Sequence, residues 1–287
     1  MARFFSQIRR RMELNHGEHE AQAIAFMLLE DECGLSRTDV LMGRDDELPE
    51  AEKQRIAAMA ERVAEGEPLQ YVTGRAEFDG LTINVAPGVL IPRPETAELV
   101  GRTAEKCVEN ANSVILDLCS GSGCIGLALK HRLPYSEVHG IDVSDDALGI
   151  AAANAARLNL DVEFHKCDLL NEEDWKQGIL SEMKGRVDVI VSNPPYICDS
   201  ERKDMERTVL DHEPGIALFV PDRNPLLFYS IITGHAGELL KGNGLLAFEI
   251  NRRFADEIGQ LMRDNGFHDV KTIKDQFDNK RIVTGRR

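Results

Sequence analysis

The chain has few of the features that mark membrane, secreted or metal-binding proteins. Its 287 residues hold no apolar run near the ~20 residues needed to cross a bilayer, and the opening segment, MARFFSQIRRRMELN, is too polar for a signal peptide. The six cysteines form no C-x-x-C pair, and no histidine cluster at zinc-ligand spacing lies near them. We therefore expect a cytoplasmic protein with reduced thiols, no contact with a membrane and no metal ion.

Basic and aromatic residues are also scarce. There are 34 basic residues against 49 acidic ones, a net charge of -15, and the chain has only four tyrosines and one tryptophan. Proteins that grip a phosphate backbone use basic side chains, and enzymes that flip a base stack it between aromatic or apolar ones. Direct binding of nucleic acid is therefore disfavoured. A content of 43% hydrophobic and 29% charged residues is typical of a soluble globular protein, here with length for two domains.

The first part of the chain has helical periodicity. Glu18–Cys33 carries apolar residues at i, i+3, i+4, i+7 and i+8, and Pro49–Glu65 carries a second apolar stripe that Gly66 ends. These two segments predict a small helical bundle. The first stripe comprises Ala21, Ile24, Ala25, Leu28 and Leu29, and the second comprises Ile56, Met59, Ala60 and Val63.

Short β-type runs follow the helical segments. Residues 71–74 and 78–85 read as strands, and the second run can pair as a hairpin around Asp79-Gly80. We predict an N-terminal helical domain over residues 1–75, a hairpin connector over 76–95 and a further domain over 96–287.

Strands and helices alternate from Ser113 onward. This alternation predicts an α/β fold with a mainly parallel sheet and crossover helices, and the tail adds two strands joined by a polar turn. The predicted strands are 114–118, 138–142, 162–165, 187–192, 245–250, 267–273 and 280–284, and the predicted helices are 125–130, 145–158, 225–240 and 253–265.

A glycine-rich loop joins the first of these strands to its helix. In D-L-C-S-G-S-G-C at 117–124, the glycines allow a tight turn and a close backbone approach to a ligand, and the helix behind them presents unpaired N–H groups. A lone G-x-G is a weak signal, and by itself an ordinary strand-to-helix turn is the better interpretation. The candidate cofactor contacts in this loop are Cys119, Ser120, Gly121, Ser122 and Gly123.

Polar residues at the next two strand ends strengthen the cofactor interpretation. Asp142 lies about 20 residues beyond the glycines, where a carboxylate can accept both ribose hydroxyls of an adenosine, and Ser144 can cap the following helix. Asp168 and Leu169 follow the third strand, where they can contact adenine, although a turn aspartate explains Asp168 equally well. A nicotinamide dinucleotide also suits this segment, since Gly126 completes G-x-G-x-x-G.

The fourth strand decides between these ligands. It leads into Asn193-Pro194-Pro195-Tyr196, at a carboxyl end where α/β folds place ligands. A proline stop followed by a core tyrosine is the alternative interpretation. After a cofactor-type loop, this tetrapeptide favours methyl transfer to a planar nitrogen.

The residue types in the tetrapeptide suit an amide substrate. An amide nitrogen is a poor nucleophile because its lone pair is delocalised, so the site must aim it. The Asn193 side-chain oxygen can accept one N–H and the Pro194 carbonyl the other, while both prolines fix the backbone and Tyr196 can pack on the planar group. A carboxylate offers no N–H, so we expect glutamine to react and glutamate not to react.

With these residues in view, the sequence resembles the HemK/PrmC family, the N5-glutamine methyltransferases of peptide-chain release factors. The resemblance runs from about residue 68 and rests on PLQYVTG at 68–74, Phe78, LIPRPET at 90–96, the loop at 117–123, NPPY at 193–196 and EPGIAL at 213–218. NPPY alone is shared by several nitrogen methyltransferases, whereas the combination is far more specific.

The resemblance implies a class I, Rossmann-like methyltransferase fold with a seven-stranded sheet and an N-terminal domain that grips the substrate. The cofactor would be S-adenosyl-L-methionine, the product S-adenosyl-L-homocysteine, and the substrate the glutamine of the Gly-Gly-Gln motif of a release factor. Cofactor binding is carried over to residues 119–123, Asp142 and Leu169, with Asp168 and Asn193 beside it. Substrate binding is carried over to Asn193, Pro194, Pro195 and Tyr196.

Two departures from the family pattern and several alternatives stand beside this interpretation. Cys119 replaces the first glycine of D-x-G-x-G-x-G, and Ala97 replaces a glutamate. Arg93 and Glu95 are equally well explained as a solvated pair in a connector, and Glu213 as a loop carboxylate. A ribosomal-protein glutamine, an amine of a nucleic-acid base, or a non-catalytic module that binds S-adenosylmethionine are the alternative functions.

Overall fold

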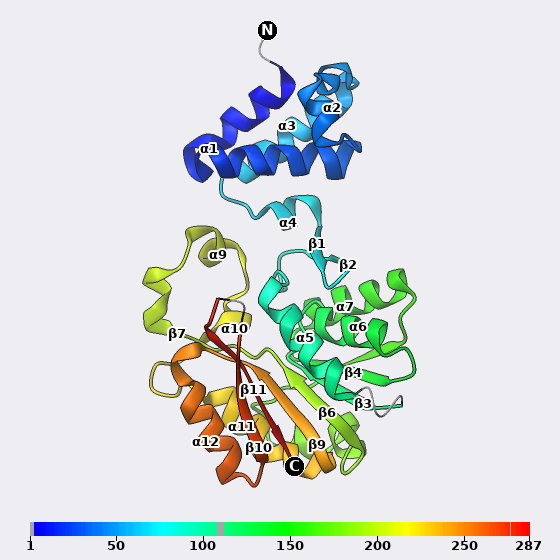
Figure 1. The fold of residues 1–287 in the computed structure, drawn as a ribbon, viewed down its shortest axis with the longest axis vertical. Helices are drawn as coiled ribbons and strands as arrows, with labels where there is room; N and C mark the ends of the chain where they lie inside the picture. Colours follow the sequence, from blue (N-terminus) through cyan, green and yellow to red (C-terminus); the bar gives the residue numbers. More distant parts are fainter. Residues whose placement is uncertain (1–2, 108–111, 276) are drawn as a thin grey trace. The chain divides into compact units, whose positions relative to one another are not determined.

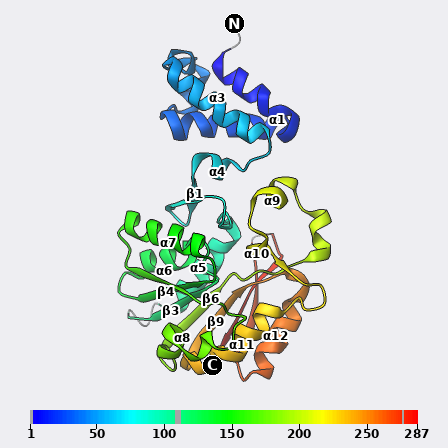
Figure 2. The same ribbon diagram turned by 180° about the vertical axis from the view of Figure 1, so that it is seen from behind.

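A computed structural model describes residues 3–107, 112–275 and 277–287, which form two compact units. The first unit comprises the described residues up to Arg75 together with Glu206–His212. The second comprises Ala76–Met205 and Glu213–Arg287, within the described ranges. Figures 1 and 2 show the chain in two opposite views. Among the helices of these ranges, none combines the length and the apolar character needed to span a bilayer.

The first unit is built around a kinked helix. Helix α1 spans Phe4–Cys33 and bends at Gly17, whose φ of 71° and ψ of 168° are not helical. The predicted apolar stripes lie in its core, with Met59 only partly buried. The remaining elements of this unit are α2 (Arg37–Leu41), η1 (Arg44–Glu47), α3 (Glu50–Ala64), α4 (Leu69–Thr73) and α9 (Arg207–His212).

The beginning of α1 was not predicted, because its cap comes from a distant segment. The backbone N–H groups of Phe4 and Phe5 donate to the carboxylates of Asp46 and Asp45 at 2.9 and 2.7 Å. These bonds satisfy donors that a local cap would otherwise serve, and the negative charge favours a helix N-terminus. With Gly17 interrupting the periodicity, the sequence shows a helix only after that residue.

The β-type run predicted at 71–74 is wrong. These residues belong to α4, which follows Pro68 and ends at Gly74, where φ is 73°. The Thr73 hydroxyl donates to the Leu69 carbonyl one turn earlier at 3.1 Å, so the β-branched side chain is satisfied within the helix. The glycine ends the helix in the left-handed conformation after a single turn.

The predicted hairpin is confirmed. Strands β1 (Arg75–Phe78) and β2 (Leu81–Asn84) form a two-stranded sheet. Asp79 and Gly80 between them have φ values of 51° and 79°, which is the pairing of two positive angles that a tight hairpin turn needs.

The second unit contains the predicted mainly parallel sheet. Its seven strands lie in the order β10-β11-β9-β6-β3-β4-β5, with β11 antiparallel to both of its neighbours and the other pairs parallel. Their bounds are β3 (Val114–Leu118), β4 (Glu137–Asp142), β5 (Val162–Lys166), β6 (Val187–Ser192), β9 (Leu240–Glu249), β10 (His268–Lys274) and β11 (Lys280–Arg286).

Helices cover both faces of this sheet. Figures 1 and 2 show α5, α6 and α7 on one face and α8, α11 and α12 on the other. The helices are α5 (Pro94–Cys107), α6 (Cys124–Arg132), α7 (Asp145–Leu158), α8 (Gly178–Glu182), α10 (Gly215–Leu218), α11 (Leu227–Leu239) and α12 (Ala255–Asp264). Shorter elements are η2 (Asp174–Lys176), β7 (Ile197–Cys198), η3 (Asp199–Asp204), β8 (Phe219–Val220) and η4 (Arg252–Phe254).

Helix α5 is missing from the sequence prediction although its signal is present. Its buried residues lie at 96, 99, 100, 103, 104 and 107, which is helical spacing. The prolines near its start made the segment resemble a connector. Pro94 occupies the first turn of the helix, however, where the missing N–H has no cost. The helix brings Thr96 against β9, next to the site described below.

Candidate active site

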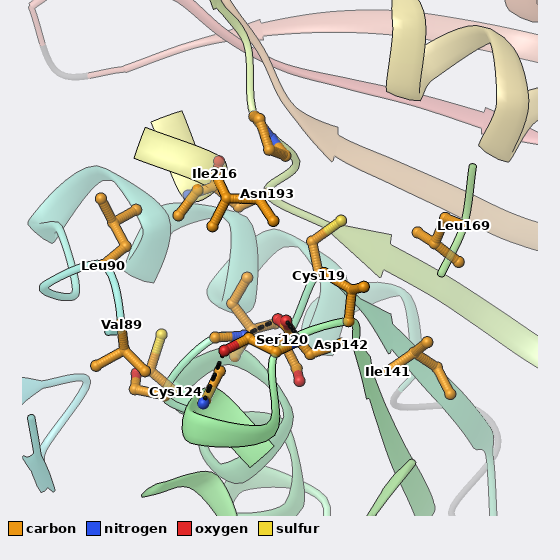
Figure 3. A pocket seen from close by; sticks show the side chains of 18 of the residues that line it. Val89, Leu90, Cys119, Ser120, Cys124, Ile141, Asp142, Leu169, Asn193 and Ile216 are labelled. Atoms are coloured by element: carbon orange, nitrogen blue, oxygen red, sulfur yellow. Dashed lines mark hydrogen bonds between the residues drawn. The ribbon is translucent and has the colours of Figure 1, made fainter. Parts of the chain in front are cut away.

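A cavity of about 210 Å³ lies in the second unit at the carboxyl ends of the parallel strands. One side, here called the glycine-loop wall, is lined by residues 119–122, 124, 141–144 and 167–170, and the other, the Asn193 wall, is lined by residues 88–90, 92, 93, 96, 193, 195, 216 and 217. Figure 3 shows Asn193 and Ile216 across the cavity from Ser120 and Asp142. The predicted site residues in the lining are Cys119, Ser120, Gly121, Ser122, Asp142, Asp168, Leu169, Asn193 and Pro195.

The turn after β3 depends on its glycines. Gly121 and Gly123 have φ values of 53° and 79°. A Cβ at Gly123 would lie 2.7 Å from the Phe164 ring, whereas one at Gly121 would meet no protein atom within 4 Å, so this backbone leaves open space on the cavity side. Below the turn, Asp117 accepts the Gly126 N–H at 2.9 Å, and burial raises the pKa of this carboxyl to about 8.

Cys119 has a backbone conformation that glycine adopts without strain. Its φ of 63° lies in the left-handed region, which costs a residue with a Cβ roughly 1 to 2 kcal/mol. Burial and the nearby Asp142 carboxylate raise the pKa of the Cys119 thiol, so the group is protonated at neutral pH. Cys119 therefore contributes a neutral, polarisable surface to the cavity.

Asp142 is held in place by the backbone on both sides of it. One carboxylate oxygen accepts the Gly121 N–H at 2.8 Å and the other accepts the Ser144 N–H at 3.0 Å. Each oxygen keeps a further lone pair for a hydroxyl donor in the cavity. Ser144 caps α7 as predicted, since its hydroxyl accepts the Ala147 N–H at 3.2 Å.

The loop after β5 is fixed by its own hydrogen bonds. Asp168 accepts the Leu170 N–H at 2.9 Å, which is a turn contact, and it also lines the cavity. The Leu169 carbonyl accepts the indole N–H of buried Trp175 at 2.9 Å. The turn interpretation of Asp168 is thus confirmed, whereas its contact with a cofactor stays a prediction, made at a residue that lines the cavity.

A chain of hydrogen bonds orients the Asn193 amide. Glu249 accepts from the Thr96 hydroxyl at 2.6 Å and from the Tyr196 hydroxyl at 3.1 Å. The Thr96 hydroxyl has a single proton, which it donates to Glu249. Its oxygen can therefore only accept a hydrogen bond from Asn193, whose Nδ2 lies 3.3 Å away. The Oδ1 of Asn193 is thus left as an acceptor at the cavity. Burial raises the pKa of Glu249, and the hydrogen bonds from Thr96 and Tyr196 oppose this shift.

An ion pair braces the loop before α5. Arg93 donates to one oxygen of Glu213, and the Ile91 N–H donates to the other at 3.1 Å. The Glu213 side chain is only 1% exposed. The solvated pair of Arg93 with Glu95 is therefore wrong, because Arg93 turns to a buried carboxylate that joins two parts of the Asn193 wall.

Comparisons with known proteins identify the family. A family model described as the PrmC N-terminal domain matches residues 2–74, and one described as the methyltransferase small domain matches residues 103–212. The release factor glutamine methyltransferase of Bacteroides thetaiotaomicron is 39% identical over 288 residues, covering 100% of each chain. The chain belongs to the release factor glutamine methyltransferase family.

A second relative supports this assignment, and a solved structure shows the fold. The release factor glutamine methyltransferase of Streptococcus pneumoniae is 35% identical over 99% of this chain and 97% of its own length. The hMettl16 catalytic domain, solved in complex with the MAT2A 3'UTR hairpin 6, aligns with a TM-score of 0.58 at 16% identity, covering 80% of this chain and 81% of that one. The latter shows the class I methyltransferase fold alone.

Some residues of this member of the release factor glutamine methyltransferase family lie elsewhere than expected. Gly123, Pro194 and Tyr196 are not in the cavity lining. The Tyr196 ring packs on the hydrophobic core, and burial raises the pKa of its hydroxyl, which donates to Glu249. Glu249 was missed altogether, because a single acidic residue at the end of a predicted strand carries no motif.

The residues present fit S-adenosyl-L-methionine, the cofactor that a methyltransferase of this family implies. The Ser120 hydroxyl is buried without a hydrogen-bond partner at the cavity, and Asp142 keeps lone pairs for hydroxyl groups. Gly121 leaves room for a ligand against the backbone, and Leu169 with Ile141 offers apolar surface to a planar ring. These groups suit the adenosine part of the cofactor.

Proposed function

We propose that this chain transfers a methyl group from S-adenosyl-L-methionine to the side-chain amide nitrogen, N5, of the glutamine in the Gly-Gly-Gln motif of a peptide-chain release factor. Family membership supports the reaction and the substrate. The observation that carries the proposal is the orientation of the Asn193 amide, whose Oδ1 is kept as an acceptor by Thr96 and Glu249.

The glycine-loop wall would hold the cofactor. S-adenosyl-L-methionine supplies an electrophilic methyl group on a sulfonium sulfur and leaves as S-adenosyl-L-homocysteine. Asp142 would accept the ribose hydroxyls, residues 119–123 would line the backbone cradle, and Asp168 and Leu169 would border the adenine. Asn193 lies across the cavity from Ser120 and Asp142. The cofactor and the substrate would meet there.

The Asn193 wall would aim the substrate amide. Asn193 Oδ1 would accept one N–H, and the carbonyl of Pro194, which stands between the lining residues Asn193 and Pro195, would accept the other, so that two acceptors set the amide plane. Positioning of this kind supplies up to ~7 to 11 kcal/mol of barrier reduction. A methylated amide nitrogen is acidic and loses its proton to water, so the site needs no strong base. Tyr196 acts through Glu249 as a positioning residue and does not stack on the substrate.

Each of three consecutive segments of the chain would have its own role. Residues 1–75 would grip the release factor, residues 76–95 would connect, and residues 96–287 would carry out methyl transfer. The model of the PrmC N-terminal domain ends at residue 74, which supports the first boundary. A substrate that serves in translation places the reaction in the cytoplasm, and it requires no contact of this chain with nucleic acid, a membrane or a metal ion.

The test is methylation of a defined release factor. Purified chain, S-adenosyl-L-methionine and recombinant release factor are incubated, and the Gly-Gly-Gln peptide is analysed by mass spectrometry. We expect one added methyl group on the glutamine and none when that glutamine is replaced by glutamate. A glutamine that stays unmodified at saturating cofactor, or methylation of ribosomal protein or nucleic acid in its place, would contradict the proposal.

A further inference from the structure

The parallel register of β4 and β5 brings together two histidines and two glutamates that are scattered in the sequence. His139 is paired with Glu163 across the strands, and Ile141 with His165. Because side chains alternate along a strand, residues 137, 139, 163 and 165 share one face of the sheet. This is the face opposite to Gly140 and Phe164, at the edge where β5 ends the sheet.

The ligand atoms of three of these residues are spaced like the corners of a metal polyhedron. His139 Nδ1 lies 3.1 Å from His165 Nε2, and the Glu163 Oε2 lies 3.6 Å from each of these nitrogens. Zinc bonds of 2.0 to 2.1 Å in a tetrahedron require ligand atoms about 3.3 Å apart, so all three distances lie within about 0.3 Å of that value. Two imidazoles and one carboxylate also form a donor set suited to Zn²⁺.

The second nitrogen of His139 already has the partner that a metal ligand needs. Its Nε2 lies 3.0 Å from a carboxylate oxygen of Glu137. A proton held on Nε2 by that carboxylate leaves Nδ1 with its lone pair toward His165, and this arrangement orients the ring and makes the ligand more basic. In the absence of an ion, a proton on His165 Nε2 fills the gap between the two rings.

Charge and exposure also suit a cation. Glu137 and Glu163 on the strands and Glu182 on α8 lie near the rings, and the Arg186 guanidinium lies 3.7 Å from the Glu137 carboxylate. The side chains are 7% exposed for His139, 27% for His165 and 66% for Glu163, so the cluster is open to solvent on one side.

We propose that His139 Nδ1, His165 Nε2 and a Glu163 carboxylate oxygen bind one divalent transition-metal ion of the zinc class, with solvent in the fourth position. Glu137 orients His139 from behind. The ion would link the edge strand β5 to β4. Its ligands lie a few residues before Asp142, which ends β4, and before Asp168, which follows β5. The proposal replaces the sequence-based expectation of no metal ion and does not depend on the proposed reaction.

The test is titration of untagged, full-length protein with Zn²⁺ by calorimetry, in the presence of a reductant that does not bind metals. We expect one ion per chain and, at a hundredfold excess of free ion over Kd, a rise in Tm of about 5 °C. Glu163→Gln, at an exposed position, should weaken binding at least about tenfold, as should His165→Gln. His268→Gln, at an exposed histidine of β10, serves as the matched control and should bind as the parent does.

Two further measurements separate this site from adventitious binding. Co²⁺ in the site should give the absorption of a tetrahedral nitrogen–oxygen complex without a thiolate charge-transfer band, and such a band would assign the ion to cysteine. Because protonated imidazole cannot bind, the Kd for Zn²⁺ should rise at least about tenfold between pH 7.5 and pH 5.5. Unchanged binding in both His165→Gln and Glu163→Gln, or no stoichiometric binding by the parent, overturns the proposal.

Discussion

The two walls of the cavity are built in different ways. The glycine-loop wall is local: the carboxylate that braces the Gly121 N–H lies 21 positions along the chain. In the Asn193 wall, the bonds from Asn193 to Thr96 and from Thr96 to Glu249 join residues 97 and 153 positions apart, and Arg93 and Glu213 lie 120 apart. The glycine-loop wall is formed by the ends of β3, β4 and β5, which follow one another along the chain, whereas the Asn193 wall joins α5, the segment after β6 and the end of β9, which are far apart in the sequence.

This difference predicts that substitutions in the two walls affect different constants. The glycine-loop wall should govern affinity for the cofactor, and the Asn193 wall should govern the rate of methyl transfer. The first and largest effect is expected for Asn193→Ala, which removes the acceptor for the substrate N–H. We expect kcat to fall at least about 1000-fold, with the Kd for S-adenosyl-L-methionine within about threefold of the parent value. Single-turnover rates and calorimetry measure the two quantities, and equal changes in both would erase the distinction between the walls.

The next largest effect is on stability, at Glu213→Ala. This change leaves Arg93 and the Ile91 N–H without their buried partner, so the free energy of unfolding should fall by about 3 kcal/mol. The matched control is Glu105→Ala, which breaks an exposed pair with Arg102 and should cost less than about 0.5 kcal/mol. Denaturant unfolding of both variants gives the comparison, and similar values for the two would show that burial of Glu213 is unimportant.

Asp142→Ala tests the expected role of the glycine-loop wall in cofactor affinity. Loss of the carboxylate removes the acceptors for two backbone N–H groups and for the cofactor hydroxyls. We expect the Kd for S-adenosyl-L-methionine to rise about 100-fold, while kcat at saturating cofactor stays within about threefold of the parent. A collapse of kcat at saturation would place Asp142 in the chemical step and contradict its assignment to binding alone.

Glu249→Gln tests whether Asn193 is oriented from behind. A glutamine amide can donate to Thr96, which then donates to Asn193 and allows that amide to flip its Nδ2 toward the cavity. We expect kcat to fall about tenfold with little change in cofactor Kd or Tm. Tyr196→Phe removes one hydrogen bond to Glu249 but keeps its carboxyl group, and it should reduce kcat less. If Tm falls in step with kcat, Glu249 has only a structural role.

The smallest effect is expected at Cys119→Gly. Glycine relieves the positive φ of this residue but loses the packing of the thiol, so the free energy of unfolding should change by less than about 1 kcal/mol. Cys119→Val places a branched side chain at the same φ and should destabilise by at least about 2 kcal/mol. Unfolding midpoints of the two variants check the sign, and a neutral valine substitution would argue against strain at this position.

Much of the fold was predictable because its signals are local. Apolar runs bounded by turn residues placed the seven strands, and the Asp79-Gly80 hairpin and the Ser144 cap are visible in a few consecutive residues. The misses have long-range causes or ambiguous local ones. The start of α1 is capped by Asp45 and Asp46 from another segment, and α4 has the composition of a strand but the end signals of a helix.

The functional residues divide in the same way, into those that local sequence determines and those that depend on distant segments. The glycine loop, Asp142 and the tetrapeptide at 193–196 are determined by sequence, because a tight turn and a fixed proline backbone need particular residue types at adjacent positions. The orientation of Asn193 by Thr96 and Glu249, the partnership of Arg93 with Glu213 and the His139–His165 pair were decided only by the tertiary structure. Each of these depends on which strands and helices become neighbours, and that information is spread over the entire hydrophobic core.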